Sequence, residues 1–470
     1  MRAVSGPVVV ILAAGKGTRL RSKTPKLLHP ICGRPMIDWV VDAARASGAS
    51  RIVVVDATGQ PLRDRLDEDI VTVVQEHRRG TADAVSAAKA EIPQDGSVVV
   101  LNGDVPLISP ETIAALARKQ SESGSGATIL SAVIDDPAGF GRVVRGADGN
   151  VEKIVETKRV EDATAEELQI HEVNTGVYAF AGGPLLEALA RVGNDNAQGE
   201  YYLTDVVALL HGQGQVVTAH ALEDMDENLG VNDRVQLAVV RKAAQRRICE
   251  ELMLAGATIV DPDNTVIDHG VTLAPDVVIE PGTALHGATA VGEDSTIGPH
   301  TTLIDVTVGN GSTVIHSYAT AVTIGDGVSV GPFAFLRPGT VLRDGAKAGT
   351  FVEIKNSDVG ERSKVPHLSY VGDTTIGEDT NLGASTITAN YDGYAKHRTK
   401  IGSRVHTGVH NSLVAPVEIG DDATIGAGSA ITKNVPDGAL GIARARQTNI
   451  EGYADRARAR HEAAEHDRAE

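Results

Sequence analysis

The sequence has few cysteines, few aromatic residues and no long apolar run. Cys32 and Cys249 are its only cysteines, so it contains no disulfide framework and no cysteine-rich metal site, and we expect a protein of the reducing cytoplasm. The first apolar run, Val8–Ala14, is too short for the core of a signal peptide and far too short to span a membrane. Aromatic residues make up only 3% of the 470 residues, whereas glycine contributes 50, which indicates tight turns and small, regular interiors.

Positive charge is also scarce overall, but it is concentrated at the start of the chain. The formal net charge is -18, which argues against a general nucleic-acid binder, because such a protein needs a basic face. No Asp or Glu precedes Asp38, yet seven basic residues do: Arg2, Lys16, Arg19, Arg21, Lys23, Lys26 and Arg34. A local excess of cations in an acidic chain predicts a local anion.

The first half of the sequence alternates strand-like and helix-like stretches. Short β-branched runs and alanine-rich helical patterns follow one another at Val8–Leu12, Ile37–Ser47, Ile52–Val55, Ile70–Val74, Ala82–Ala90 and Val98–Leu101. Strands that alternate with helices predict an α/β fold with a mainly parallel sheet covered on both faces.

The second half has a different rhythm. Residues Asp233–Ala255 predict one long helix, because the segment has no Gly or Pro and many strong helix formers. From about Thr258, small aliphatic residues recur every six positions, at Ile324, Val330, Leu336, Leu342, Ala348 and Ile354 and again at Ile419, Ile425 and Ile431. This period fits neither an amphipathic helix nor a two-faced strand, and it predicts short strands coiled into a narrow prism. The alternative is a β-rich domain with coincidental spacing, which the length of the run disfavours.

These patterns divide the chain into residues 1–232, a linker helix at 233–257, a repeat domain at 258–452 and a tail at 453–470. We expect the tail to be a frayed helix or disordered. The polar segment Asn390–Lys400 interrupts the repeat, and loops inserted into a solenoid often carry function.

The opening glycines predict a phosphate site. Gly15-Lys16-Gly17 follows a strand, and glycines let backbone amides approach an anion. The P-loop motif is absent, and Leu20 stands where a dinucleotide-binding turn needs its third glycine. Taken alone, these residues are also compatible with a solvated basic turn.

A second feature supports the phosphate site. The strand-like run Val98–Leu101 ends in Asn102-Gly103-Asp104, and ligands of parallel sheets lie beyond the carboxyl ends of the strands. An aspartate facing a phosphate loop there is a suitable Mg²⁺ ligand. The alternative is an ordinary turn residue.

The repeat domain contains three residues suited to chemistry. Arg337 and Lys355 are cations among aliphatic repeat positions, and the pair could hold a sugar phosphate. His367 is the only candidate base of its segment, and a neutral imidazole can deprotonate an amine near pH 7. A lone histidine is, however, more often structural than catalytic.

Two motifs, LAAGKGTRL at Leu12–Leu20 and PKLL at Pro25–Leu28, resemble those of the sugar-phosphate nucleotidylyltransferases. Coupled to a hexapeptide-repeat half, the chain from about Val8 to Tyr453 resembles the bacterial family of bifunctional N-acetylglucosamine-1-phosphate uridylyltransferases and glucosamine-1-phosphate N-acetyltransferases. The resemblance implies a Rossmann-like first domain, a left-handed parallel β-helix and a cytoplasmic homotrimer whose second site lies between subunits. The handedness rests on the resemblance alone, since general rules favour right-handed crossovers.

For the first half, the resemblance implies that UTP and N-acetylglucosamine-1-phosphate become UDP-N-acetylglucosamine, a precursor of the cell envelope, with Mg²⁺ held by Asp104 and Asn232. Arg19 and Lys26 would stabilise the departing pyrophosphate. The nucleotide and sugar would contact Leu12, Ala13, Ala14, Gly15, Lys26, Gln75, Gly80, Thr81, Asn102, Gly103, Asp104, Gly141, Glu156, Asn174 and Asn232. Relatives often carry an aromatic residue where Asn102 stands, which touches local packing more than the metal.

For the second half, the resemblance implies acetyl transfer from acetyl-CoA to glucosamine-1-phosphate with His367 as the base. Glucosamine-1-phosphate would contact Arg337, Lys355, Tyr370 and Asn381, and acetyl-CoA would contact Ala384, Asn390, Tyr391, Val409, Ala427 and Arg444, with Lys396 a contact of either. Val409 departs from the family, because relatives usually have a serine there, so a hydroxyl contact to the cofactor would be lost.

Two alternatives remain open at this point. The repeat could be a scaffold beside a working nucleotidylyltransferase, in which case His367→Ala would leave activity unchanged and no CoA would be released. The whole chain could instead be a non-catalytic assembly protein, but the presence of Lys26, Asp104 and Asn232 together counts against that.

Overall fold

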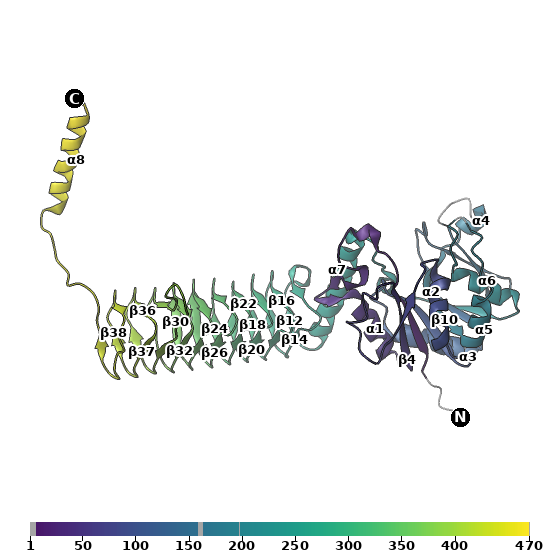
Figure 1. Ribbon diagram of the computed structural model, residues 1–470, viewed down its shortest axis with the longest axis horizontal. Helices are drawn as coiled ribbons and strands as arrows, with labels where there is room; N and C mark the ends of the chain where they lie inside the picture. The colour runs from purple at the N-terminus through teal and green to yellow at the C-terminus, as the bar shows by residue number, and fades with distance from the viewer. Residues whose placement is uncertain (1–5, 158–162, 197, 470) are drawn as a thin grey trace. The chain divides into compact units, whose positions relative to one another are not determined.

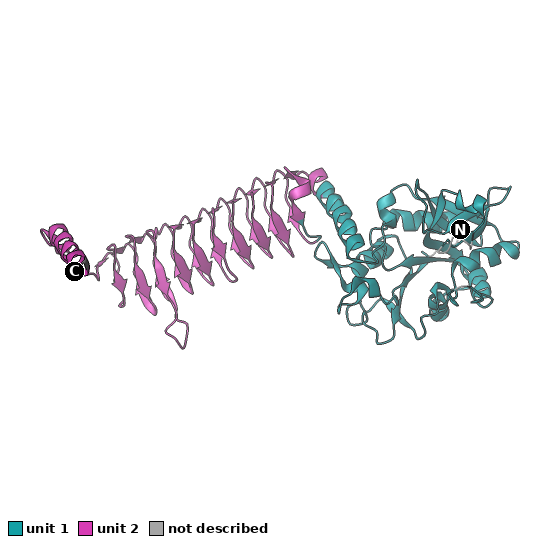
Figure 2. Cartoon of the chain, turned by 90° about the horizontal axis from the view of Figure 1, so that it is seen from above, with its two compact units in different colours: residues 1–251, 267–269 teal, residues 252–266, 270–470 magenta. Residues whose placement is uncertain are grey.

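The computed structural model of the chain describes residues 6–157, 163–196 and 198–469 (Figure 1). They form two compact units: the first comprises Met1–Glu251 with Ile267–His269, and the second comprises Leu252–Val266 with Gly270–Glu470 (Figure 2).

The first unit is built on a mixed sheet. Its strands lie in the order β11 (Val217–Ala221), β7 (Ala127–Val133), β10 (Glu172–Ala181), β6 (Ser97–Asn102), β1 (Val8–Leu12), β4 (Arg51–Ala57) and β5 (Val71–Gln75), and the hairpin β8 (Arg142–Arg145)–β9 (Val151–Val155) branches from β10. β6, β1, β4 and β5 are parallel, as the sequence pattern predicts. β10 is antiparallel to both of its neighbours, so the sheet is parallel around the glycine-rich turn but not throughout.

Alternating side chains of β1 explain why helices cover both faces of this sheet. Val9 and Ile11 belong to one apolar core and Val8 and Val10 to the other, since successive strand residues point to opposite faces. The first core is closed by α1 (Met36–Ala46), α3 (Pro110–Ser123) and α7 (Arg234–Leu254), and the second by α2 (Thr81–Ala87), α5 (Gly182–Leu189) and α6 (Thr204–Gly212). The remaining described elements of this unit are η1 (Thr18–Leu20), η2 (Lys26–Leu28), β2 (Pro30–Ile31), β3 (Arg34–Pro35), η3 (Lys89–Glu91), α4 (Ala165–Leu168) and η5 (Met225–Asn228).

The long helix expected at 233–255 is α7. Asp233 caps it, because its Oδ1 accepts hydrogen bonds from the backbone nitrogens of Val235 and Gln236, both at 2.9 Å. A side-chain cap of this kind satisfies backbone donors that have no partner within the first helical turn. The cap also fixes the position of the residue before it, Asn232.

The second unit is a three-sided parallel β-helix, which confirms the coil predicted from the period of six. The six aliphatic residues Ile324, Val330, Leu336, Leu342, Ala348 and Ile354 are each 1% exposed or less. Each strand pairs in parallel with the strand one coil further on, as in Ser329↔Lys347↔Lys364. One small aliphatic residue per side therefore fills the interior, which leaves no room for aromatic rings.

The strands of this unit form three faces. The first face contains β12 (Thr258–Ile259), β15 (Val278–Ile279), β18 (Thr296–Ile297), β21 (Thr313–Val314), β24 (Ser329–Val330), β27 (Lys347–Thr350) and β30 (Lys364–His367), and it continues through a bridge at Asn381 to β35 (His406–Thr407), β38 (Thr424–Ile425) and β40 (Leu440–Gly441). The second face contains β13 (Val266–Ile267), β16 (Ala284–His286), β19 (Thr302–Ile304), β22 (Tyr318–Thr320), β25 (Phe335–Leu336), β28 (Glu353–Lys355), β31 (Tyr370–Gly372), β33 (Ile387–Ala389), β36 (Ser412–Val414) and β39 (Ala430–Ile431). The third face contains β14 (Thr272–Leu273), β17 (Ala290–Val291), β20 (Thr307–Val308), β23 (Thr323–Ile324), β26 (Val341–Leu342), β29 (Asp358–Val359), β32 (Thr374–Ile376), β34 (Thr399–Ile401) and β37 (Val417–Ile419).

Two further helices belong to this unit: η6 (Pro262–Asn264) and, in the tail, α8 (Tyr453–Ala469). Of the two expectations for the tail, the helical one holds. The described side chains of α8 are exposed. No helix among the described residues is both long enough and apolar enough to cross a membrane.

Candidate active sites

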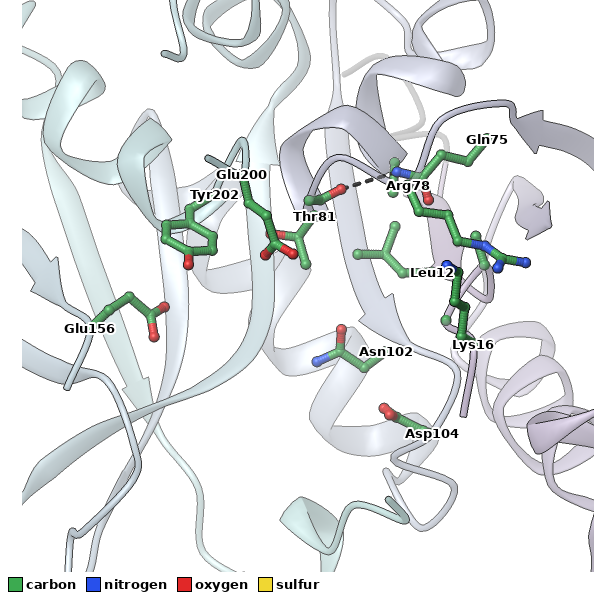
Figure 3. Close-up of a pocket in the computed structure, with 14 residues that line it drawn as sticks. Leu12, Lys16, Gln75, Arg78, Thr81, Asn102, Asp104, Glu156, Glu200 and Tyr202 are labelled. Atoms are coloured by element: carbon green, nitrogen blue, oxygen red, sulfur yellow. Dashed lines mark hydrogen bonds between the residues drawn. The ribbon is translucent and has the colours of Figure 1, made fainter. Parts of the chain in front are cut away.

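The glycine-rich turn after β1 borders a cavity at the carboxyl ends of the parallel strands. The turn is tied down by the Ala13 nitrogen, which donates to the Val55 carbonyl, and by the Gly103 nitrogen, which donates to the Leu12 carbonyl, both at 2.9 Å. The cavity has a volume of about 540 Å³ and is lined by Leu12, Ala14, Gly15, Lys16, Gln75, Arg78, Gly80, Thr81, Ala84, Asn102, Asp104, Glu156, Glu200 and Tyr202 (Figure 3). The strand ends thus meet in one hollow, as the fold class predicts.

We define residues 19–30 as the basic loop. Gly17 lets Lys26 of this loop pack against the glycine-rich turn. Its φ is +59°, and a Cβ there would lie 2.6 Å from the Cβ of Lys26. A side chain at this position would therefore be strained and would displace Lys26. The glycine is needed here for the close approach of a cation.

Four residues predicted for the first site contact one another. The Lys26 ammonium lies 2.5 Å from Asp104 Oδ2 and 3.3 Å from Asn232 Oδ1. The Arg19 guanidinium donates to the same Asn232 oxygen at 2.8 Å. The chain thus brings together two cations, a carboxylate and an amide from positions up to 213 residues apart.

The oxygens of Asp104 and Asn232 are hard ligands of the kind that a divalent metal ion takes. Both lie within 3.3 Å of a single atom, the Lys26 nitrogen, so the two oxygens already share one cation, the Lys26 ammonium. One carboxylate with a second hard oxygen is a common protein contribution to Mg²⁺, which completes its shell with water and phosphate oxygens. Among the described residues, no group of three or more His, Cys, Asp and Glu side chains is placed to hold a metal ion.

Helix α7 anchors the basic loop. Arg234 Nε donates to the Leu20 carbonyl at 3.1 Å, and Arg241 donates to the Pro30 carbonyl through Nε at 3.0 Å and Nη2 at 2.7 Å. His29 is buried in the same loop, and burial, followed by the charges of Arg234 and Arg241, lowers the pKa of its imidazole. The loop that carries Arg19 and Lys26 is therefore held against helix α7 by side-chain hydrogen bonds.

Gln75 is oriented for recognition by its own side-chain nitrogen. This nitrogen donates to the Gly80 carbonyl at 3.1 Å and to Asp83 Oδ2 at 2.8 Å, and Gln75 also lines the cavity. The carbonyl oxygen of its amide is then the group available to accept from a ligand. Gly80 has a φ of +122°, and a Cβ there would lie 2.3 Å from the Tyr201 carbonyl oxygen, so this wall is closely packed.

The opposite end of the cavity is acidic. Glu156 lies there, with its Oε1 3.4 Å from the Thr204 hydroxyl. Burial and the Glu156 carboxylate raise the pKa of Asp205. Of the other residues predicted to hold the sugar, Gly141 and Asn174 do not line the cavity but lie next to each other, with the Asn174 nitrogen donating to the Gly141 carbonyl at 2.9 Å.

Four residues that line the cavity were not predicted from the sequence: Arg78, Ala84, Glu200 and Tyr202. Lys16, which also lines it, belongs to the predicted phosphate turn. Glu200 and Tyr202 reach it because Tyr201 pairs with the turn before Gly80, its nitrogen donating to the Arg79 carbonyl at 2.7 Å. No local pattern signals such a contact. Arg78 stands in the basic run His77–Arg79, and that run is the signal that could have found it.

In the second unit, three cations lie on neighbouring coils. Arg337 follows β25, Lys355 is in β28 and Lys396 is in the inserted segment 390–400. Arg337 is paired with Glu353 at 2.8 Å. The contact with Lys355 and its charge lower the pKa of Lys396, and neighbouring cations favour an anion beside them.

Asp373 and Asn390 hold this cluster in shape. Asn390 Nδ2 donates to Asp373 Oδ2 at 2.5 Å, and Asn356 Nδ2 donates to Asp373 Oδ1 at 2.6 Å. Burial would raise the pKa of Asp373, but these hydrogen bonds and the nearby lysines outweigh it and hold the pKa below its usual value. Tyr370 completes the cluster, with its hydroxyl 3.4 Å from Asn390 Nδ2.

His367 begins a column of predicted residues on successive coils. The Ser385 nitrogen donates to the His367 carbonyl, the His410 nitrogen to the Ala384 carbonyl, and the Gly428 nitrogen to the Val409 carbonyl. His367, Ala384, Val409 and Ala427 thus follow one another along the coil axis, and the His367 side chain is exposed. Tyr391 and Arg444 are also exposed, and Asn381 forms the bridge between β30 and β35.

The fold and the first site define a nucleotidyltransferase joined to a hexapeptide-repeat domain. Residues 9–205 match the family of MobA-like NTP transferase domains, and residues 398–433 match the hexapeptide repeat of succinyl-transferase. NTP transfer of this kind is generally dependent on a divalent metal.

The chain belongs to the family of bifunctional GlmU proteins. It is 48% identical to the bifunctional protein GlmU of Desulfitobacterium hafniense strain DSM 10664, over 94% of this chain and 97% of that protein. It is 50% identical to that of Kineococcus radiotolerans over 95% and 91%, and 47% identical to that of Streptomyces avermitilis over 97% and 96%. The family assignment, the α/β and left-handed β-helix fold class and the two transferase activities predicted from the sequence are confirmed.

Proposed function

We propose that the chain makes UDP-N-acetylglucosamine in two steps, one in each unit. The second unit transfers the acetyl group of acetyl-CoA to the amine of glucosamine-1-phosphate. The first unit then transfers the uridylyl group of UTP to N-acetylglucosamine-1-phosphate and releases pyrophosphate. The observation that carries the assignment of the first site is the contact cluster of Arg19, Lys26, Asp104 and Asn232 at the cavity.

Uridylyl transfer needs positioning and charge neutralisation more than proton transfer. The phosphate oxygen of the sugar phosphate is already an anion and attacks the α-phosphorus of UTP, so no general base is required. Lys26 faces the phosphates, and Arg19 stabilises charge on the departing pyrophosphate. Asp104 and Asn232 would hold Mg²⁺, which when bound neutralises phosphate charge.

The two ends of the first cavity divide recognition between base and sugar. The Gln75 carbonyl oxygen accepts the N3–H of uracil, and the backbone at Gly80-Thr81 contacts the carbonyl edge, a task that suits amide groups. The sugar lies toward Glu156, with Asn102, Gly141 and Asn174 beside it. The proposed direction is supported by Figure 3, in which Lys16 and Arg78 lie at one end of the cavity and Glu156 at the other.

Acetyl transfer uses His367 as the base that deprotonates the sugar amine. Arg337, Lys355 and Lys396 hold the sugar phosphate, and the column from Ala384 to Ala427 holds acetyl-CoA. The amine attacks the thioester carbonyl directly, since neither cysteine lies near these residues in the sequence. Cys32 and Cys249 are both free thiols, in keeping with the reducing cytoplasm in which we place the enzyme.

We also propose that three copies assemble through the β-helix. Phe333, Phe351 and Leu368 are 54%, 58% and 57% exposed on adjacent coils, and the rings of Phe333 and Phe351 stack at 5.3 Å. An exposed apolar stripe of this kind is typical of a protein interface. Leu368 adjoins His367, so a second copy on this stripe would complete the acetyltransferase site. Light scattering of the full chain in solution tests for the trimer.

The experiment that tests the function is one incubation followed by mass spectrometry. It contains the full chain, glucosamine-1-phosphate, acetyl-CoA, UTP and Mg²⁺, and we expect UDP-N-acetylglucosamine, CoA and pyrophosphate. His367→Ala should abolish CoA release but leave uridylylation of supplied N-acetylglucosamine-1-phosphate intact, and Asp104→Ala should do the reverse. If no acetylated product forms in the wild type while uridylylation persists, the β-helix is a scaffold; unchanged pyrophosphate release by Asp104→Ala would contradict the metal assignment.

A further inference from the structure

Strand β10 is irregular where it lies against Asn102, a lining residue of the first cavity. Its register against β7 shifts between Asn174 and Tyr178, so the strand bulges there. Gly176 lies within the bulge with a φ of +81°, and a Cβ at this position would lie 2.7 Å from Asn102 Nδ2. Bulges re-aim side chains and are frequent beside active sites.

The side chain of Asn174 closes this bulge and is held at both ends. Its Oδ1 accepts from the Gly176 nitrogen at 3.1 Å, and its Nδ2 donates to the Tyr178 hydroxyl at 2.8 Å. An amide nitrogen carries two hydrogens, and an amide oxygen can accept two hydrogen bonds. These contacts therefore fix the plane of the amide and leave one hydrogen and one acceptor position of Asn174 for a ligand.

The bulge also contacts the wall of the cavity. Asn102, which lines the first cavity (Figure 3), donates from Nδ2 to the Gly176 carbonyl at 3.2 Å. Gly141 lies close to the start of the bulge, since its carbonyl accepts from the Asn174 nitrogen at 2.9 Å and a Cβ on it would lie 3.7 Å from the Asn174 Cβ. The bulge thus joins the three residues that we place beside the sugar: Asn102, Gly141 and Asn174.

Tyr178 supports this arrangement from the apolar core. Its side chain is 3% exposed, and its ring stacks on that of Phe180 at 5.4 Å. Burial raises the pKa of its phenol, so the hydroxyl stays protonated. A buried hydroxyl is costly unless it is hydrogen-bonded, and phenylalanine would fill the same space without that cost. The contact with Asn174 is therefore what the hydroxyl adds to the packing of the ring.

We propose that Tyr178 is a positioning residue of the first site, whose buried hydroxyl fixes the amide of Asn174 for contact with N-acetylglucosamine-1-phosphate. This inference rests on the uridylyl transfer and the sugar contact proposed above. A sugar hydroxyl both donates and accepts, so it matches the one hydrogen and the one acceptor position that Asn174 has left. Tyr178 itself does not touch the substrate and acts only through Asn174.

Loss of the phenol hydroxyl should affect binding of the sugar and not binding of the nucleotide. One hydrogen bond between neutral groups corresponds to about a two- to twelvefold change in affinity. We expect Tyr178→Phe to raise the KM for N-acetylglucosamine-1-phosphate about fivefold, because the released amide of Asn174 can rotate away from the sugar. The KM for UTP should stay within about twofold, since Gln75 is held by separate contacts with Gly80 and Asp83.

The experiment compares the steady-state kinetics of the full chain with those of Tyr178→Phe, Asn174→Ala and the double variant. Thr128→Val is the matched control, because it also removes a buried hydroxyl from this sheet. Thr128 lies in the neighbouring strand β7, its hydroxyl pairs with that of Thr218 at 2.8 Å, and it does not line the cavity. Thermal unfolding and acetyl transfer by each preparation show that both units are folded.

The double variant separates positioning from general packing. Substitutions of side chains that act independently have additive effects, whereas those of side chains that act as a unit do not. The proposal is supported if Tyr178→Phe raises the KM for the sugar phosphate, Thr128→Val does not, and Tyr178→Phe causes no further rise in the Asn174→Ala background.

Other results would overturn it. An unchanged KM for the sugar phosphate in Tyr178→Phe shows that Asn174 keeps its place without the hydroxyl, and an unchanged KM in Asn174→Ala removes the residue through which Tyr178 acts. Equal rises for the sugar phosphate and UTP, an equal rise in Thr128→Val or additive effects in the double variant reduce the hydroxyl to a support of the sheet. A wild-type chain that forms no UDP-N-acetylglucosamine would instead refute the proposed function, and is therefore distinguishable from a failure of the Tyr178 assignment.

Discussion

The contact between helix α7 and the basic loop predicts that Arg234 controls the first reaction without touching substrate. Arg234→Met keeps the length of the side chain and suits a helix, but it removes the guanidinium that donates to the Leu20 carbonyl at 3.1 Å. Leu20 directly follows Arg19, whose guanidinium contacts Asn232 at 2.8 Å. Loosening Leu20 should therefore displace the group that stabilises the leaving pyrophosphate.

The expected loss follows from the hydrogen bond itself. A partly buried hydrogen bond from a charged donor contributes about 1.5–3 kcal/mol, and each 1.4 kcal/mol corresponds to about a tenfold change in rate. If half of that free energy goes into placing Arg19, kcat for uridylyl transfer falls about threefold to twelvefold. The remainder should appear as a small decrease in the stability of the first unit.

The bifunctional chain supplies its own control. Acetyl transfer by the same preparation of Arg234→Met should be unchanged, because its predicted residues all belong to the other unit. Arg246→Met is the matched variant on α7, since Arg246 pairs with Asp226 on the surface and does not contact the basic loop. Uridylyl turnover of Arg234→Met within twofold of wild type, or a parallel decrease in both activities, would refute the reasoning.

Three other predictions concern pH, shape and cofactor binding. The pKa of His29 is lowered in the fold, so the unfolded chain binds a proton at this histidine before the folded chain does as the pH falls below about 6.5. The free energy of unfolding should therefore decrease as the pH falls through this range. In urea titrations at pH 5.5–7.5, His29→Gln should reduce the dependence of that free energy on pH by up to about 1.4 kcal/mol per pH unit. In Gly372→Ala the new Cβ would lie 2.4 Å from the Tyr370 hydroxyl and 2.7 Å from Asn390 Nδ2. Acetyl transfer should therefore fall at least about tenfold, while the thermal unfolding temperature barely changes. Normal turnover would show that acetyl transfer does not depend on the positions of Tyr370 and Asn390. Val409→Ser should lower the KM for acetyl-CoA about fivefold, the effect of one added hydrogen bond, and an unchanged KM would mean that the backbone alone serves the cofactor there.

The two halves of the fold differed in how far the sequence could predict them. The β-helix follows from local information, because each repeat contributes one inward residue such as Leu336 or Ile354 and contacts only the coils beside it. Strand β10 (Glu172–Ala181) was not expected. Its register shifts between Asn174 and Tyr178, which breaks the alternation of apolar and polar residues that indicates a strand. Its place between β6 and β7 also depends on contacts between residues that are distant in sequence.

The candidate sites show the same division. Lys26, Asp104 and Asn232 were chosen because motifs carry them, but the 2.5 Å contact of Lys26 with Asp104 joins residues 78 apart and exists only in the folded chain. Arg78 was missed because a basic turn is usually a solvated surface. Arg78 lines the cavity, whereas the neighbouring Arg79 forms an ion pair with Asp83. The sequence alone does not distinguish these two arginines.

The two phosphate sites also differ in how their cations are arranged before substrate binds. Lys26 is already paired with Asp104 at 2.5 Å, so the positive charge of Lys26 is balanced before any phosphate binds. Lys396, by contrast, has a pKa lowered chiefly by its contact with Lys355, because two neighbouring ammonium groups repel each other. A phosphate dianion placed between them removes that repulsion and raises the pKa of Lys396 again. Binding of glucosamine-1-phosphate should therefore be accompanied by proton uptake at alkaline pH, and the second site should hold its substrate more weakly as the pH rises through the lowered pKa of Lys396.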